Sequence, residues 1–358
     1  MATATTDQVW RAEGTTPTAI EAALRRLLAD AHRANESYVP ARVLNLVCIV
    51  DREYSGEIAN RLRRVGRYHP SRTVVCSVSE GQTDLDAVAT IAAPAEVAPG
   101  HFASTRETVI VEMGPQHLEH LDTIVDPLVV TDLHTVVWSP HGHPEAVDAL
   151  LRLAQIVLVD SVDEPVPADA IARVLELMPQ TYIVDLAWLR STPWRERIAA
   201  AFDPPARRPD LRRIAELTVR HHPDSEIAGL LLVGWLGSRL GWTCSPLVTR
   251  GGAAGGMVGT AAAGKQDVRV RLEGDPSMSV RGLSGLTVKL SSGESLSLDR
   301  GEGGLRASRV DRRGHAQEWT VVGASRGESG ILGEGIRQAL LRDPTYKPAL
   351  VCAKDLVG

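Results

Sequence analysis

Residues 42–51, RVLNLVCIVD, indicate the fold class expected of this chain of 358 residues. The run at 43–50 is apolar almost throughout, which is typical of a strand buried on both faces of a parallel sheet. A helix is predicted at 55–65 and a second strand at 73–78. Strand, helix and strand in this order indicate a doubly wound α/β sheet.

The same alternation continues along the first half of the chain. Further strands are predicted at 85–92, 108–113, 135–138 and 156–159, with helices at 116–125 and 144–153. Residues 1–14 are polar and are expected to be loose, and Thr16 is expected to cap the helix that follows them. The sequence therefore predicts an N-terminal tail and helix at 1–39 and an α/β domain with a mostly parallel, doubly wound sheet at 40–162.

The pattern of predicted elements changes after the acidic, proline-containing stretch 163–167. The helix predicted at 227–240 is apolar on most sides but contains Arg239 and is shorter than the roughly 20 residues of a bilayer span, so it is expected in a core. Residues 251–264 are glycine and alanine almost throughout, and residues 259–265 are expected to form a flexible loop between strands. Later alternation predicts antiparallel hairpins, and a helix at 329–341 is expected to end the fold. Residues 163–358 are therefore predicted to form an α+β domain.

Composition excludes several function classes. A net charge of −5 argues against general binding to nucleic acid or to anionic membranes, because both require a basic surplus. The first residues lack the features of a signal peptide. The four cysteines form no CxxC pair, and Cys352 is expected to have no nearby second cysteine with which to close a disulfide, which predicts reduced thiols and no internal redox switch. We expect a cytoplasmic protein without metal or cofactor.

Three short motifs imitate catalytic sites. The P-loop spacing at 259–265 is followed by Gln266 instead of Ser or Thr, and a strand pattern follows it. The GxSxG motif at 323–327 has no histidine after its serine. The histidine pairs at 141/143 and 221/222 lack further ligands nearby, and the first turn, DREYSG at 51–56, lacks GxGxxG. No catalytic machinery is predicted.

The most specific stretch is DLAWLRSTPWRERIAAAFDPP at 185–205. Thr192 and the proline after it predict the start of a helix, with Thr192 as the N-cap. Trp194, Ile198 and Phe202 form one apolar face, so Arg195 and Arg197 are expected to be exposed.

This stretch closely resembles the "DL.W.R.TPWRE...FDPP" pattern of the glucose-6-phosphate dehydrogenase assembly protein (OpcA) family. The resemblance extends over most of residues 40–345, including RVLNLVCIVD, HPSRTVV at 69–75, IVLVDS at 156–161 and ESGILGEGIRQAL at 328–340. It implies a non-catalytic partner that assembles or allosterically activates glucose-6-phosphate dehydrogenase, at the head of the pentose phosphate pathway that supplies NADPH.

Two other classes of function stay open. The first is a small-molecule or nucleotide-binding enzyme that uses the doubly wound domain, since ligands favour the carboxyl ends of its strands. The second is a structural subunit of an oligomer. An assay of the protein alone, and then with the dehydrogenase, would separate these classes.

Tryptophan and arginine residues are the candidates for partner binding, because both types are enriched in interface hot spots. Core packing for the tryptophans and a solvated face for the arginines are the competing interpretations. The hypothesis comprises one group in the 185–205 stretch and a basic group near the first return helix: Trp188, Arg190, Trp194, Arg195 and Arg197, with Arg61, Arg64 and Arg72.

Overall fold

The computed structural model divides the chain into two compact units. The first unit comprises Met1–Val159, Pro179–Val184 and Leu332–Leu341, and the second comprises Asp160–Met178, Asp185–Ile331 and Arg342–Gly358. The residues described are 5–40, 42–65, 70–94, 103–250, 256–301, 303–322, 328–339 and 341–358. The domain limits 1–39, 40–162 and 163–358 stay a prediction.

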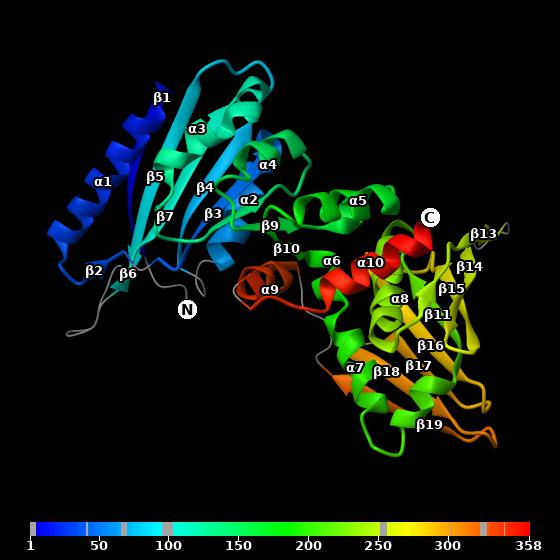
Figure 1. Ribbon diagram of the computed structural model, residues 1–358. Helices are drawn as coiled ribbons and strands as arrows, with labels where there is room; N and C mark the ends of the chain where they lie inside the picture. Colours follow the sequence, from blue (N-terminus) through cyan, green and yellow to red (C-terminus); the bar gives the residue numbers. More distant parts are fainter. Residues whose placement is uncertain are drawn as a thin grey trace. The chain divides into compact units, whose positions relative to one another are not determined.

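The first unit contains an eight-stranded sheet with the order β1-β5-β7-β4-β3-β8-β9-β10 (Figure 1). The strands from β7 to β9 run parallel, whereas β5 is antiparallel to β7 and β1 to β5. Between β7 and β10 the order follows the 3-2-1-4-5-6 arrangement of doubly wound folds, which confirms the predicted fold class. The strands are β1 Thr5–Thr15, β3 Leu44–Asp51, β4 Ser71–Val78, β5 Leu85–Pro94, β7 Arg106–Met113, β8 Thr135–Trp138, β9 Ile156–Val159 and β10 Tyr182–Asp185.

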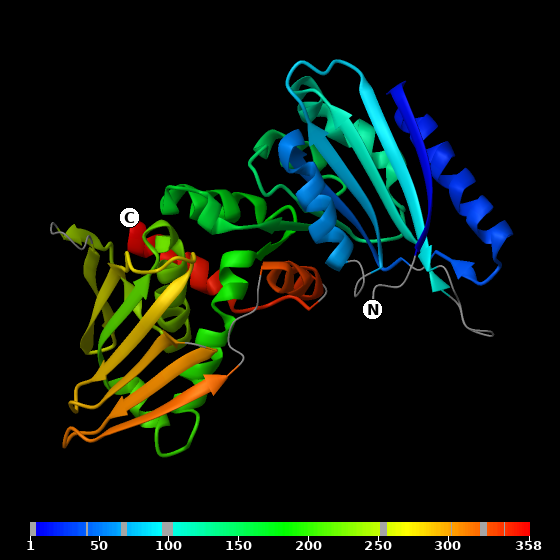
Figure 2. The same cartoon turned by 180° about the vertical axis from the view of Figure 1, so that it is seen from behind.

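Helices cover both faces of this sheet. Helix α2 (Arg52–Val65) lies on one face, and α3 (Leu121–Val125) and α4 (Pro144–Leu150) lie on the other (Figures 1 and 2). Helix α1 (Pro17–Ala34) packs against β1 and β5, and the Thr16 side chain accepts a hydrogen bond of 3.3 Å from the Ala19 amide. The predicted cap is therefore confirmed. Short elements complete the unit: β2 Tyr38–Val39, β6 Ala103–Ser104, and the 3-10 helices η1 Pro115–His120 and η2 Asp126–Leu128.

Two expectations about the first sheet are wrong. The N-terminal stretch is not a loose tail, because Thr5–Thr15 form β1 and pair with β5. The many polar residues of β1 do not predict a strand. The segment is a strand because it pairs with β5, which lies far along the chain. Strand β10 lies within residues 163–358, which were predicted to form the second domain, but it is the last strand of this sheet. The predicted helix at 116–125 is present as the 3-10 helix η1, which ends at His120, followed by α3 from Leu121 to Val125.

The second unit contains a nine-stranded sheet in which only β11 and β15 pair in parallel among the pairings described. Its order is β12-β14-β15-β11-β16-β17-β18-β19, with β13 paired to β14. The antiparallel character confirms the predicted α+β class. The strands are β11 Ile214–His221, β12 Thr243–Cys244, β13 Val248–Arg250, β14 Gly256–Ala263, β15 Gln266–Gly274, β16 Leu283–Leu290, β17 Ser295–Gly301, β18 Gly304–Val310 and β19 Ala316–Val322.

Helices pack on one face of this sheet, and none of the described helices covers the other face (Figure 2). Helix α8 (Glu226–Leu240) is buried along most of its length, as predicted. Helix α10 (Tyr346–Val357) packs directly on it, where a Cβ atom added at Gly234 would lie 2.2 Å from the Ala349 carbonyl oxygen. A glycine is therefore required at this helix crossing.

The remaining helices are α5 Pro167–Leu177, α6 Leu186–Arg190, α7 Thr192–Phe202 and α9 Glu328–Ala339, with the 3-10 helices η3 Ser161–Asp163, η4 Arg208–Arg213 and η5 Pro223–Ser225. Among the described residues, none of the helices is both long and apolar enough to cross a lipid bilayer.

Two expectations about the second half of the chain are corrected, and a third concerns residues that the structure does not describe. Helix α10, not the predicted helix at 329–341, is the last element. Most of the glycine- and alanine-rich segment forms β14, and the P-loop motif therefore spans a strand and a turn, a geometry that does not cradle phosphates. The GxSxG motif at 323–327 lies outside the described residues.

Candidate functional site

The stretch 185–205 begins at the end of β10 and continues through α6 and α7 in the second unit. Asp185 is 1% exposed and receives several hydrogen bonds. Its carboxylate accepts from the amides of Ala187 and Ser161 at 2.9 and 3.2 Å, from Ser161 Oγ at 2.5 Å and from the Tyr346 hydroxyl at 2.8 Å. Asp185 thus caps α6 and also holds the first turn of α10. Burial and the Asp185 charge raise the pKa of Tyr346.

Trp188 makes a second connection between α6 and α10. Its indole Nε1 donates to Asp343 Oδ2 at 2.8 Å, and its ring centroid lies 5.3 Å from that of Tyr346. Asp343 in turn accepts from the amide and hydroxyl of Thr345 at 2.8 and 2.6 Å. Burial raises the pKa of Asp343, but the hydrogen bonds from Thr345 and Trp188 and the Arg195 charge lower it overall.

Arg195 is buried, at 8% exposed, although the sequence predicted exposure. Its guanidinium carbon lies 3.6 Å from the Trp188 ring centroid, and its nitrogens donate to Ser191 Oγ at 3.1 Å, Thr192 Oγ1 at 2.9 Å and the Trp188 carbonyl at 3.3 Å. A longer contact of 3.4 Å reaches Asp343. Burial lowers the pKa of Arg195 to about 10, and Asp343 opposes that decrease.

Helical periodicity misplaced Arg195 because the carboxylate and the indole that surround it come from outside α7. We call Asp185, Trp188, Arg195, Asp343 and Tyr346 the anchor network. It joins α6 and α7 to α10 and leaves little of its charge in contact with solvent.

The other candidates of this stretch have different surroundings. Arg190 pairs with Asp160 at 2.7 Å, and burial raises the pKa of Asp160 to about 7 although Arg190 acts to lower it. Trp194 is 3% exposed and belongs to the predicted apolar face. Arg197 is half-buried, and its Nε has no hydrogen-bond partner among the described residues. The predicted N-cap is also wrong, because α7 begins at Thr192 itself and Ser191 precedes it.

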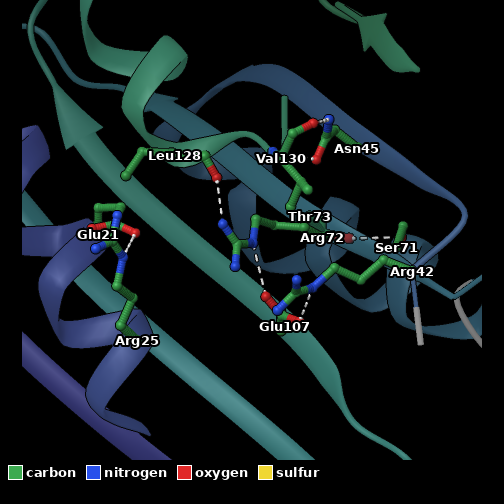
Figure 3. A network of polar contacts seen from close by, with 10 residues as sticks. All are labelled: Glu21, Arg25, Arg42, Asn45, Ser71, Arg72, Thr73, Glu107, Leu128 and Val130. Atoms are coloured by element: carbon green, nitrogen blue, oxygen red, sulfur yellow. Dashed lines mark hydrogen bonds and ion pairs between the residues drawn. The ribbon is translucent and has the colours of Figure 1, made fainter. Parts of the chain in front are cut away.

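The basic group near α2 does not form one surface. Arg72 is 7% exposed, and its Nε donates to Glu107 at 2.8 Å while its Nη1 donates to the Leu128 carbonyl at 3.1 Å (Figure 3). Arg42 also pairs with Glu107, which is 1% exposed. Arg61 keeps 40% of its side chain exposed and pairs with Glu57 at 2.7 Å. The Arg64 side chain lies outside what the structure describes.

Arg72 was expected in a cationic patch and is instead part of a buried ion cluster at the amino ends of β4 and β7. An arginine can be buried where a carboxylate distant in sequence meets it. Glu107 supplies that carboxylate.

The carboxyl ends of β3 and β8 form the topological switch point at which doubly wound folds bind ligands. Asp51 Oδ1 lies 3.0 Å from His143 Nε2, and the Tyr54 and His141 rings stack with centroids 4.2 Å apart. His143 has a φ of 57°, an uncommon conformation for a residue with a side chain. Helix α2 begins directly after β3, so no glycine-rich loop separates the two.

The switch-point side chains therefore contact one another, which sequence reasoning missed. The available signal was their position just after two adjacent parallel strands. Within the described part of the chain, no three His, Cys, Asp or Glu residues are grouped so that they could hold a metal ion.

The expectation that Cys352 lacks a neighbouring cysteine is wrong. A Cβ atom added at Gly237 would lie 2.7 Å from Cys352 Sγ and 3.1 Å from Cys244 Sγ, so both sulfurs flank the same point. A hydrogen bond from Cys352 lowers the pKa of Cys244 and raises that of Cys352. Both thiols are free and buried.

Comparison with known proteins assigns the chain to a family. Residues 181–350 match the profile of the C-terminal domain of a glucose-6-phosphate dehydrogenase subunit, and residues 63–176 match the profile of its N-terminal domain. Among solved structures, a WlbA (WbpB) dehydrogenase from Thermus thermophilus in complex with NAD and α-ketoglutarate aligns with 88% of this chain and 93% of its own. That alignment has 14% identity and a TM-score of 0.45, a likeness too distant to carry a functional conclusion.

Two curated relatives are each described as an OxPP cycle protein OpcA. The Synechococcus elongatus protein is 30% identical over 183 residues, which are 50% of this chain and 41% of that protein. The Synechocystis sp. protein is 28% identical over 234 residues, which are 63% of this chain and 46% of that protein. The matched part of the chain thus spans less than half the length of these relatives. Since the two domain profiles together cover most of its residues, the chain belongs to the OpcA family.

Proposed function

We propose that this protein is a non-catalytic subunit that binds glucose-6-phosphate dehydrogenase and favours its assembled, active state. The observation that carries this proposal is the match to both domain profiles named for a subunit of that enzyme. The names of the relatives support a place in the oxidative pentose phosphate pathway, where the enzyme supplies NADPH. To activate an enzyme, a partner must bind its active state more tightly, and a preference of about 1–3 kcal/mol changes the balance roughly 5- to 150-fold.

The chemistry of the 185–205 stretch supports an accessory role. A catalytic acid, base or nucleophile must reach its substrate. In the anchor network, Asp185 and Arg195 are 1% and 8% exposed and are engaged with neighbouring side chains. Their arrangement favours stability of the second unit over chemistry.

We place the docking contact on the outer side of α2. Among the basic residues proposed for binding, Arg61 retains a substantially exposed charge, whereas Arg72 is buried against Glu107. A charge at the rim of an interface mainly affects the association rate and its salt dependence, and a desolvated one contributes more.

The experiment measures binding of the purified protein to the dehydrogenase by light scattering during size-exclusion chromatography. Arg61→Glu should weaken the complex at least tenfold, about 1.4 kcal/mol. Arg25→Glu is the matched control, because Arg25 forms the same i,i+4 pair with a glutamate on α1. A complex that forms normally with Arg61→Glu would move the docking contact away from α2. Absence of any complex would overturn the proposed function, and turnover by the protein alone would favour an enzyme.

A further inference from the structure

Strand β1 is the outer strand of the eight-stranded sheet. It is 11 residues long and pairs with β5 on one side, and no other strand among the described residues pairs with it (Figure 1). The free edge of such a strand presents unpaired backbone N–H and C=O groups, which form a template for another strand. Typical strands have about 5–6 residues, and exposed edges are usually kept shorter still.

The side chains of β1 carry a symmetric pattern of charge. Asp7, Val9 and Arg11 share one face of the strand, and Val9 is 48% exposed at its centre. Both charged residues are exposed, and neither forms an ion pair with any described residue. Their partners across the strand pair are the uncharged Ala92 and Val88 of β5. Two opposite charges therefore flank an exposed valine and find no counterpart in their own sheet.

We propose that β1 pairs antiparallel with β1 of a second copy of this chain, around a two-fold axis at Val9. This register places Asp7 of each copy opposite Arg11 of the other and Val9 opposite Val9. Directly opposite Cβ atoms lie about 4.5–5.5 Å apart, which is close enough for oppositely charged side chains to pair. The same patch serves both copies, as a two-fold interface requires.

Other registers that keep the two sheets facing the same way are less favourable. A two-fold axis at Asp7 or at Arg11 would place that residue opposite the same residue of the other copy, and so oppose like charges. An axis at Trp10 would place Asp7 opposite Glu13, which also opposes like charges. A two-fold at Ala12 would pair Arg11 with Glu13, but it falls at the bulge between Ala12 and Thr15. The register at Val9 is therefore the one that joins opposite charges along regular strand.

A cysteine on the axis provides the first test. In Val9→Cys the two new thiols would face each other across the axis, at the separation of antiparallel strands, which is compatible with a disulfide. Mild oxidation of the full chain should give a covalent dimer on a non-reducing gel. Glu13→Cys is the control, because Glu13 would lie opposite Thr5 of the second copy and far from Glu13 of that copy. The native cysteines are buried and compete little. Equal crosslinking of both variants, or none for Val9→Cys, would overturn the proposal.

Charge exchange provides the second test, read from the dissociation constant in sedimentation equilibrium. Asp7→Arg and Arg11→Asp each create two like-charge pairs and should weaken the dimer about tenfold. The double exchange restores opposite charges and should recover the original dissociation constant. A wild-type chain that stays monomeric at high micromolar concentration, or a double exchange that fails to recover dimerisation, would contradict the pairing.

Discussion

Replacing Arg195 by alanine should destabilise the second unit much more than the same change at Arg197, two residues further along α7. Arg195 donates hydrogen bonds to Ser191 and Thr192, stacks on Trp188 and reaches Asp343. Removing one partner of a buried pair costs about 3–5 kcal/mol, and since Asp343 keeps 25% of its side chain exposed, we expect about 3 kcal/mol. Urea unfolding followed by tryptophan fluorescence measures the change.

Arg197→Ala is the matched control for that measurement. Its Nε is buried without a hydrogen-bond partner among the described residues, so truncation should change the free energy of unfolding by less than about 1 kcal/mol. Most of the tryptophans belong to the second unit, so their fluorescence reports on the relevant transition. Equal effects of the two substitutions would refute the assignment of Arg195 to the anchor network.

Three further substitutions test the second unit, each by its free energy of unfolding. Tyr346→Phe removes a hydrogen bond to buried Asp185 and should cost about 1.5–3 kcal/mol, whereas no loss would mean that the hydroxyl is dispensable. Gly234→Ala forces a Cβ to 2.2 Å from the Ala349 carbonyl oxygen and should cost about 1–3 kcal/mol. Gly56→Ala is the control, because Gly56 has open space around it, and this change should be neutral or stabilising. Equal effects of the two changes would argue against a tight crossing of α8 and α10. Burial raises the pKa of Asp160 from 3.8 to about 7, so its contribution to stability is complete below pH 3.8 and is lost as the pH rises towards 7. Asp160→Asn should flatten this part of the pH profile, and an unchanged slope would contradict the raised pKa.

Local patterns in the sequence were sufficient for the fold class. The continuous apolar runs that became β3 and β4 predicted buried parallel strands, and their order along the chain predicted a doubly wound sheet. Strand β1 was missed because its polar residues show no strong alternation and its partner β5 lies far along the chain. Strand β10 falls in the range predicted for the second domain but joins the first sheet, because proximity in sequence does not determine which sheet a strand joins.

The surroundings of the candidate site residues could not be predicted from periodicity. A helical pattern gives the apolar face of α7 but does not reveal that Asp343 approaches Arg195 from outside the helix. Glu107 buries Arg72 in the same manner. One clue was available, because the Asp-Pro-Thr sequence at 343–345 is typical of a helix start and could have predicted α10.

Activation is tested most directly by titrating this protein into a fixed amount of glucose-6-phosphate dehydrogenase, with the initial rate of NADPH formation as the readout. We expect no rate from the protein alone and a saturable increase in the rate of the enzyme, through a higher kcat or a lower KM for the sugar phosphate. A complex that forms without any change in kcat or KM would contradict activation.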